Sequence, residues 1–212
     1  MKIDSKLDFE FDFYGYLTIQ VDLDLYALRN HFDETEWIRY SNLDCVKITK
    51  TELVAPEIAR LGASVTNFKN KLVVVAGGTN EIGSDYATVE IYSLVDEKWT
   101  KAPKLNERRC NHSSCTLGDS VYLFGCTGGI SSSAIEWLDF EAHLRGHYQP
   151  HWNIIRPDAD LLKARVSSLF CPVNSTQILI MGGSNKSKLL EDAFVFDTSD
   201  ESVTPLDCWG PG

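Results

Sequence analysis

The sequence lacks the features that would place the protein in a membrane or on a nucleic acid. No apolar run approaches the roughly 20 residues that a membrane-spanning helix needs, and the first residues, MKIDSKLDFEFDF, alternate charges with aromatics, unlike a signal peptide. Basic residues are in the minority, because 20 Lys and Arg stand against 30 Asp and Glu, for a net charge of -10. Proteins that bind a phosphate backbone usually carry a basic face. We therefore expect a globular, cytoplasmic protein that binds neither membranes nor nucleic acids.

Paired cysteines and catalytic signatures are missing as well. The six cysteines form no CxxC pair in this chain of 212 residues, which is too large to need disulfide bonds for its stability, so reduced thiols are expected. The sequence contains no G-x-S-x-G elbow, no H-E-x-x-H pair and no G-x-x-x-x-G-K-[ST] phosphate loop. We therefore predict a protein that is not an enzyme and has no cofactor.

Three segments of the chain repeat one apolar pattern. Each is an apolar, β-branched or aromatic run that ends in glycine, as expected of a buried strand before a tight turn: KLVVVAGG (71–78), SVYLFGC (120–126) and TQILIMGG (176–183). An alternating strand follows each run: TVEIYSL (88–94), AIEWLDF (134–140) and AFVFDT (193–198). Two of the units then carry a tryptophan, Trp99 or Trp152, whereas the last has only SVTPL there. The last unit is therefore expected to be complete only in part.

An arginine precedes each glycine-terminated run at a nearly constant distance. The distance is 17, 16 and 17 residues for the pairs Arg60 and Gly77, Arg109 and Gly125, and Arg165 and Gly182. Chance rarely keeps such a register. The arginines open the segments RLGASV, RCNHSSC and RVSSLF, whose small and polar residues suit strands that are crowded near an axis where neighbouring units converge.

These segments divide the chain into units of about 50 residues. The boundaries are 1–55, 56–105, 106–160 and 161–212, and the third unit contains a long loop at 141–151. Residues 1–55 fit less well, with strand candidates LDFEFDF, YLTIQVDL and LDLYAL followed by EWIRY with Trp37, and without a glycine pair. A single four-stranded sheet cannot bury both of its faces, so the units must stack. The sequence predicts an all-β fold.

The pattern resembles the kelch repeat, the four-stranded blade of a β-propeller. The resemblance rests on the doublets Gly77-Gly78 and Gly182-Gly183, on the aromatic residues of the third strands, on Trp99 and Trp152, and on Arg109 with His112 and Ser113. Cys126 departs from it, because it replaces the second glycine after Gly125. The resemblance implies a kelch-type β-propeller of about four four-stranded blades.

The number of blades leaves two arrangements open. Kelch propellers usually have five to seven blades, and this chain supplies at most four, which is the lower limit for a propeller. A partial or degenerate ring, completed by other sequence or by another chain, is favoured over a closed four-blade ring. An open arc would expose apolar side faces of its terminal blades unless these are covered.

One end of the propeller is the expected binding face. Consecutive strands of a blade are antiparallel, so the loops 79–86, 127–133 and 184–191 should share one end with Arg60, Arg109 and Arg165. Three guanidiniums around an axis would form a shallow basin for carboxylates, which arginine binds with two parallel hydrogen bonds. The resemblance implies that partner peptides, often acidic, dock on this face. We therefore predict a protein-interaction scaffold whose partner-binding residues are Arg60, Arg109, Arg165, Asn80, Ser131 and Asn185.

Two alternatives stay open at this point. The arginines could instead bond to backbone carbonyls of neighbouring blades and tie the ring together. The chain could also be a structural piece of a larger assembly or oligomer without a basin of its own.

The stretch HLRGHYQPH (143–151) contains His143, His147 and His151 at a spacing of four. Two histidines four apart on a helix can bind zinc, but Gly146 and Pro150 disfavour a helix. We therefore expect a loop that connects two strands and no metal site. An enzyme or metal-binding protein that uses residues 139–151, with Asp139 or Glu141 as a further ligand, is the alternative.

Overall fold

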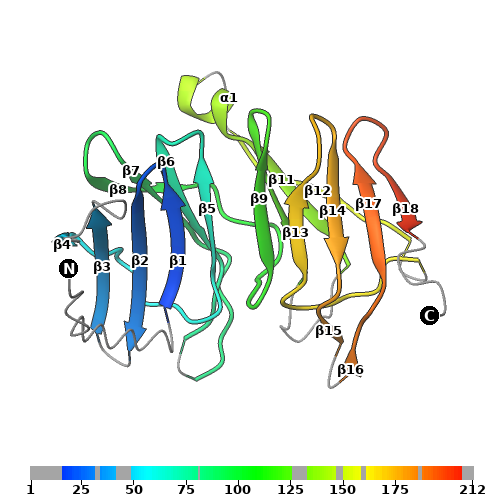
Figure 1. Cartoon of the computed structure of the whole chain (residues 1–212), viewed down its shortest axis with the longest axis horizontal. Helices are drawn as coiled ribbons and strands as arrows, with labels where there is room; N and C mark the ends of the chain where they lie inside the picture. Colours follow the sequence, from blue (N-terminus) through cyan, green and yellow to red (C-terminus); the bar gives the residue numbers. More distant parts are fainter. Residues whose placement is uncertain are drawn as a thin grey trace, which may run out of the picture.

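The computed structural model describes residues 16–31, 34–41, 49–80, 82–125, 133–146, 150–158, 161–185 and 188–206. These residues form four antiparallel sheets of four strands each, which follow one another along the chain (Figure 1). The first sheet contains β1 (Tyr16–Val21), β2 (Asp24–His31), β3 (Glu34–Ser41) and β4 (Thr49–Leu53). The second contains β5 (Ser64–Phe68), β6 (Leu72–Ala76), β7 (Val89–Ser93) and β8 (Lys98–Ala102).

The third and fourth sheets repeat this order. The third contains β9 (Ser113–Leu117), β10 (Ser120–Phe124), β11 (Ile135–Asp139) and β12 (Asn153–Ile155). The fourth contains β13 (Leu169–Pro172), β14 (Gln177–Met181), β17 (Ala193–Asp197) and β18 (Ser202–Leu206). A hairpin of β15 (Ser184–Asn185) and β16 (Lys188–Leu189) lies between β14 and β17 in the chain.

The all-β fold predicted from the repeats is confirmed, and two of its details are corrected. The last unit has its fourth strand, β18, because SVTPL pairs along β17 without needing a tryptophan. In the first unit the fourth strand is β4, which the sequence did not predict, and Trp37 belongs to the third strand, β3. The segment LDFEFDF lies outside the described residues.

The sheets stack face to face, and this explains their sequences. Every residue of β6 is buried, since the second sheet has a neighbour on each face. Three apolar clusters fill the spaces between consecutive sheets, and the inner strands β1, β5, β9 and β13 lie against one another in succession. The four units therefore depend on their neighbours for burial.

The tryptophans lie in these layers. Trp37 is 1% exposed, and its ring centroid lies 5.5 Å from that of Tyr92 and 5.4 Å from that of Trp99. Two indole N-H groups tie their units to the preceding segment, since Trp99 Nε1 donates to Val54 O at 2.7 Å and Trp152 Nε1 donates to Pro103 O at 2.9 Å.

The described strands form an open arrangement. Figure 1 shows the first sheet at one side of the molecule and the fourth at the other, with the second and third between them. No described strand of the first sheet pairs with one of the fourth. One face of each terminal sheet consequently has no neighbouring sheet among the described strands.

The prediction of a loop across residues 143–151 is wrong for its first part. Residues Phe140–Arg145 form a short helix, α1, which is capped at its start by Asp139, whose Oδ1 accepts a hydrogen bond from Ala142 N at 2.8 Å. Gly146 does not interrupt this helix but ends it, with a φ of 66°. His143 is therefore helical, while His147 lies outside the described residues.

Candidate functional site

The three registered arginines lie inside their units. The first strands β5, β9 and β13 each begin four residues after their arginine. The side chains of Arg60, Arg109 and Arg165 are completely buried. The segments before the first strands therefore cross the interior of the molecule.

Each guanidinium binds the carbonyl of the glycine with which it is in register. Nη1 donates to that oxygen at 3.0 Å between Arg60 and Gly77, at 2.9 Å between Arg109 and Gly125, and at 3.1 Å between Arg165 and Gly182. The constant spacing of 16 or 17 residues in the sequence thus reflects one repeated hydrogen bond. It joins the start of a unit to the end of that unit's second strand.

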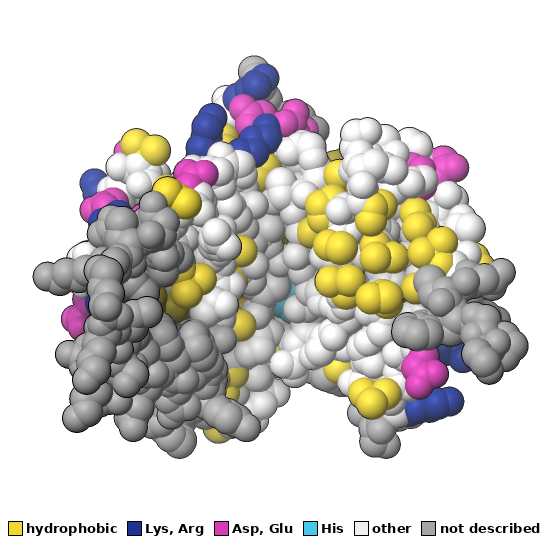
Figure 2. All heavy atoms as spheres, viewed as in Figure 1, with side chains coloured by type: hydrophobic (Ala, Val, Ile, Leu, Met, Phe, Trp, Pro, Cys, Tyr) yellow, Lys and Arg dark blue, Asp and Glu magenta, His cyan; other side chains and the backbone are white. Residues whose placement is uncertain are grey.

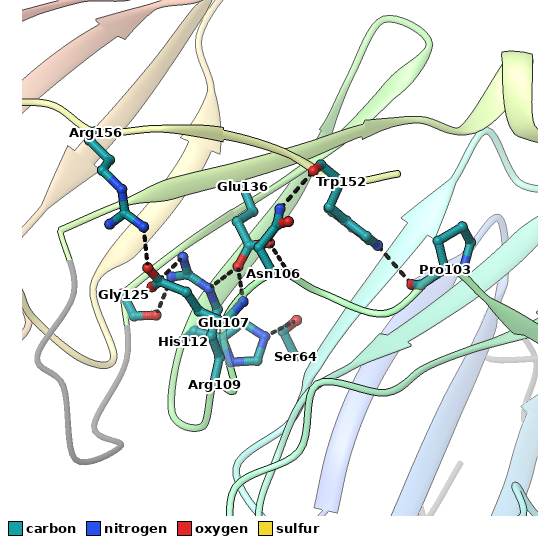
Figure 3. Close-up of polar contacts among 10 residues, drawn as sticks. All are labelled: Ser64, Pro103, Asn106, Glu107, Arg109, His112, Gly125, Glu136, Trp152 and Arg156. Carbon is teal, nitrogen blue, oxygen red and sulfur yellow. Dashed lines mark hydrogen bonds and ion pairs between the residues drawn. The ribbon is translucent and has the colours of Figure 1, made fainter. Parts of the chain in front are cut away.

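Each guanidinium also pairs with an acidic residue of its own unit. Arg60 pairs with Glu90 of β7, and Arg109 Nε donates to Glu136 Oε1 of β11 at 2.8 Å (Figure 3). Arg165 pairs with Asp192, which precedes β17. Glu90 and Glu136 are buried with their arginines, and Asp192 is partly exposed. Such pairs are costly to break, since the remaining charge would be buried without a partner.

Glu136 organises the segment that leads into the third unit. Its carboxylate accepts from Asn106 N at 2.6 Å and from Glu107 N at 3.2 Å, besides its bond to Arg109. Arg156 Nη2 in turn donates to Glu107 Oε1 at 2.8 Å (Figure 3). In the second unit, Glu90 Oε1 accepts from Glu57 N at 2.9 Å in the same way. Burial lowers the pKa of Arg60, and the nearby Glu90 carboxylate opposes this shift.

The predicted basin of surface guanidiniums is therefore corrected. The hydrogen bonds of all three arginines are directed to carbonyls and carboxylates of their own units, and none of their side chains opens onto the surface. The alternative in which the arginines bond to backbone carbonyls describes them better, except that the carbonyls belong to the same unit. An incoming carboxylate would have to displace the acidic partner, which is buried in the second and third units and partly exposed in the fourth.

The main chain of the segments that begin at Arg109 and Arg165 connects each unit to the one before it. Arg109 O accepts from Gly78 N at 2.7 Å, and the residue two positions later, Asn111, donates its N-H to Gly62 O at 2.7 Å. The link recurs one unit later, where Ser167 N donates to Asn111 O at 3.0 Å. Gly62, Asn111 and Ser167 all have a positive φ between 51° and 59°. The backbone therefore repeats the same hydrogen bond between consecutive units, just as the arginine side chains repeat the same hydrogen bond within each unit.

His112 is buried between the second and third units. A hydrogen bond of 2.9 Å joins its Nε2 to Ser64 Oγ of β5 (Figure 3), while its Nδ1 has no partner among the described residues. Burial, with the Arg109 charge nearby as a smaller cause, lowers the pKa of His112 to about 3. The imidazole is consequently neutral at pH 7, and it is a packing residue of the inter-unit contact.

The second-to-third strand loops share one end of the molecule. Leu61 and Thr79 exchange backbone hydrogen bonds of 2.9 and 2.8 Å, and Val166 and Ser184 exchange equivalent bonds of 2.9 and 3.0 Å. The hairpin β15–β16 therefore projects from the end at which the arginine segments enter, whereas α1 lies at the opposite end (Figure 1). The described parts of these loops lie at the same end of the molecule, as predicted.

We call this end the loop face and define it by Leu61, Asn80, Ile82, Asn185 and Leu189. Asn80 shapes its loop, because its Oδ1 accepts from Ser84 N at 2.7 Å. Asn185 pairs with Lys188 in the β15–β16 hairpin. Three apolar side chains are exposed here, with Leu61 at 44%, Ile82 at 86% and Leu189 at 79%. Ser131, the remaining predicted residue, lies outside the described residues.

Sequence reasoning missed two parts of this arrangement. Glu90 and Glu136 occupy the same position of the third strand, in TVEIY and AIEWL, so a repeated acidic residue on a buried strand was the available signal. Ile82 and Leu189 were present in the predicted loops, but their exposure depends on how each loop folds.

The metal alternative at 139–151 gains no ligand set from the described part of the chain. Within that part, no group of three or more His, Cys, Asp and Glu side chains is arranged to hold a metal ion. Asp139 and His151 do line a cavity of about 130 Å³, together with Trp137 and Pro150. Because His147 is not described, the alternative stays a prediction.

Comparisons with known proteins bear on these units. The family model of the kelch motif matches residues 59–106, which contain the second sheet. Adagio-like protein 3 of Oryza sativa subsp. japonica is 25% identical over 127 residues, covering 60% of this chain and 19% of that protein. Adagio protein 3 of Arabidopsis thaliana is 27% identical over 111 residues, covering 50% and 17%.

A third relative has the name of an enzyme. The N-(sulfonatooxy)prop-2-enimidothioate sulfolyase of Thlaspi arvense is 28% identical over 102 residues, covering 47% of this chain and 28% of that protein. The matched segment is thus less than a third of each of these relatives. Among the described residues, no helix has the length and apolar character needed to cross a bilayer. The resemblance found in the sequence is confirmed: residues 59–106 carry a kelch motif, and the described residues form four antiparallel sheets of four strands each.

Proposed function

We propose that this chain is a protein-interaction module that binds a partner protein through its loop face. The single observation that carries the proposal is that Leu61, Ile82 and Leu189 are exposed on segments that share one end of the molecule. Exposed apolar side chains grouped on loops that a rigid scaffold positions are typical of binding surfaces.

The partner that fits this face has an apolar surface. The acidic peptide expected from the arginines is not supported, because their guanidiniums are buried and paired within the units, and the chain has a net charge of -10. A polar rim is available from Asn80, Ser84 and Lys188. A cytoplasmic location and the absence of catalysis belong to the same proposal.

Substitutions on the loop face test the proposal. Ile82→Asp and Leu189→Asp together should reduce capture of the chain's partners by at least about tenfold, because each places a charge in an apolar contact. Leu144→Asp is the matched control, since Leu144 is 50% exposed on α1 at the opposite end. Quantitative mass spectrometry of proteins retained by immobilised chain gives the readout, and circular dichroism checks folding. Equal retention by all variants, or equal loss with Leu144→Asp, would refute the loop face as the binding surface.

A further inference from the structure

The second sheet has an open edge that is bordered by a cavity. Its strands are arranged in the order β5-β6-β7-β8, so β8 has a neighbour on one side only among the strands that the structure describes. A cavity of about 480 Å³ lies beside β8. Its lining includes the consecutive residues 97–101 and, from the segment between β4 and β5, Val54, Ala55 and Glu57. The cavity therefore follows the direction of the strand.

The main-chain groups of Trp99 and Lys101 point out of the sheet at this edge. Leu94 N, just after β7, donates to Lys71 O, just before β6, at 2.9 Å. Residues of an antiparallel strand alternate between its two neighbours, so Ser93 and every second residue before it face β8. Their partners on β8 are Lys98, Thr100 and Ala102. Trp99 and Lys101 consequently direct their N-H and C=O groups away from β7, where no described residue bonds them.

Trp99 gives the cavity an apolar wall. Its indole is partly exposed and lies beside Val54, which is 70% exposed. The corresponding tryptophan of the third unit, Trp152, is 1% exposed, because Phe140 at the start of α1 packs on it with 6.0 Å between the ring centroids. The helix thus covers Trp152, whereas Trp99 is left facing a cavity. An apolar side chain from a partner would be buried there.

The charges beside the cavity favour an acidic partner. Each acid in the lining already has a basic partner: Glu57 with Lys101, Glu90 with Arg60, and Glu97 with Arg39. Lys98 is exposed and has no ion pair with any described residue. On the side of the molecule drawn in Figure 2, by contrast, the basic side chains lie next to acidic ones. In a chain with a net charge of -10, Lys98 provides a local positive charge for an incoming carboxylate.

Trp99 and Lys98 lie on opposite faces of β8. Trp99 packs towards the first sheet, and Ala102, which shares the face of Lys98, packs towards the third. A strand that pairs with β8 would place its own side chains alternately on these two faces. Apolar residues beside Trp99 and acidic residues beside Lys98 therefore require an alternating sequence.

The other outer strands lack this combination. Strand β12 has only three residues, and α1 covers its neighbouring tryptophan. Strand β18 contains Pro205, which has no N-H for a further strand, and it has no tryptophan. Strand β4, TKTEL, has no aromatic residue. The site is thus specific to the second unit among the units described.

From this geometry we propose that the edge of β8 binds an extended peptide segment of a partner protein in which apolar and acidic residues alternate. The segment adds a fifth strand to the second sheet. Its backbone exchanges hydrogen bonds with Trp99 and Lys101, its apolar side chains enter the cavity beside Trp99, and its carboxylates lie near Lys98. The site shares no residue with the loop face, so the two binding surfaces are independent.

The test uses the labelled peptide ELEFELE as the probe and fluorescence anisotropy with the full chain as the readout. We expect saturable binding with a Kd below about 1 mM. The peptide EEEELFL has the same composition without alternation, and KLKFKLK has the opposite charge. Both should bind at least about tenfold more weakly, because each loses one of the two complementary features. Absence of saturation by ELEFELE, or equal binding of either control, would overturn the proposal.

Two substitutions at one position test the added strand. Lys101→Pro removes an N-H that points out of the sheet, at a place where an edge strand tolerates proline. Lys101→Gln removes the same charge and keeps the N-H. The proline variant should bind ELEFELE about three- to tenfold more weakly than the glutamine variant, as expected for one lost hydrogen bond. Equal affinities would overturn the proposal.

Hydrogen exchange of the unsubstituted chain gives an independent arm, should the proline variant fail to fold. Saturating ELEFELE should slow exchange of the Trp99 and Lys101 amides at least about tenfold, because both become hydrogen-bonded. Exchange of the β4 amides should stay the same. Unchanged exchange at Trp99 and Lys101, or equal slowing in β4, would overturn the proposal.

Charge reversal and a loop-face control make the result specific. Lys98→Glu should weaken ELEFELE roughly two- to fivefold and strengthen KLKFKLK, whereas Ile82→Asp should leave both unchanged. Loss of ELEFELE binding with Ile82→Asp would overturn the separate site without refuting the loop face. A chain that self-associates in light scattering and becomes monomeric with Lys101→Pro would overturn the proposal in favour of a second copy at this edge.

Discussion

At the residue scale, a buried arginine occupies the same position in three of the units. Arg109 is 0% exposed and satisfies its donors with Gly125 O, Glu136 and Glu107. Buried ion pairs contribute little net stability compared with apolar packing, but removing one partner is costly. The pair therefore fixes the geometry of its unit, and it does so without contributing a surface for ligands.

Arg109→Met should destabilise the protein by about 3 to 5 kcal/mol, because Glu136 would remain buried without its partner. The measurement is the free energy of unfolding in urea. Arg156→Met is the control, since Arg156 pairs with Glu107 at the surface, and an exposed pair contributes at most about 1 kcal/mol. Similar losses for the two variants would contradict the burial of the Arg109 pair.

His112 should make stability depend on pH. Its pKa is about 3 in the folded protein and about 6.5 when unfolded, so the unfolded state binds the proton first. This contribution is fully present above pH 6.5 and is lost as the pH falls towards 3, by about 1.4 kcal/mol per pH unit. His112→Gln removes the titrating group, so the difference in urea stability between wild type and variant should change over pH 6.5 to 5. A difference that stays constant with pH would contradict the buried, neutral imidazole.

The arginines could be predicted from the sequence, whereas their acidic partners keep one position in only two of the three units. The number of residues between arginine and glycine is nearly constant, at 16 or 17. One hydrogen bond joins the two residues in each unit, and the two strands between them have similar lengths. The acid lies 30 residues after Arg60 but 27 residues after Arg109 and Arg165, and it lies within the third strand as Glu90 and Glu136 but before that strand as Asp192. Phe194 occupies the equivalent strand position in the last unit, with its ring centroid 5.3 Å from the Arg165 guanidinium carbon.

At the scale of strands and helices, apolar runs that end in glycine identify the strands well. β6, β10 and β14 lie where the repeated runs predict them, because such runs are buried, on both faces in β6 and β10 and on the face towards the third sheet in β14. Helix α1 was missed because Gly146 and Pro150 are helix breakers, yet the helix ends before both. The fourth strand of the first unit, TKTEL, is mostly polar. A mostly polar strand at the edge of a sheet is difficult to recognise from the sequence.

Gly77→Ala and Gly182→Ala compare the same position with and without a following unit. Both glycines have a φ of 62°, so alanine costs a similar strain of roughly 1 to 2 kcal/mol at each. Gly77→Ala should cost distinctly more, because its Cβ would collide with Arg109 O. Urea denaturation measures both losses, and equal values would contradict the close contact between the second and third units.

At the scale of the whole molecule, four stacked sheets leave two surfaces for interaction. The loop face lies at one end, and the edge of β8 borders the second sheet (Figure 1). The repeats predicted the number of units and their stacking. The arrangement of loops in space and the exposure of Ile82 depend on contacts between distant segments, which no repeat reveals.

The most direct test of the account is site-specific photo-cross-linking of the full chain in a lysate. A photoreactive residue would replace Ile82 in one sample and Leu144 in another, with adducts identified by mass spectrometry. The account predicts discrete adducts at position 82 that excess unlabelled chain competes away, and none of them at position 144. Adducts that form equally at both positions, or only at 144, would contradict the loop face as the place where this protein binds its partner.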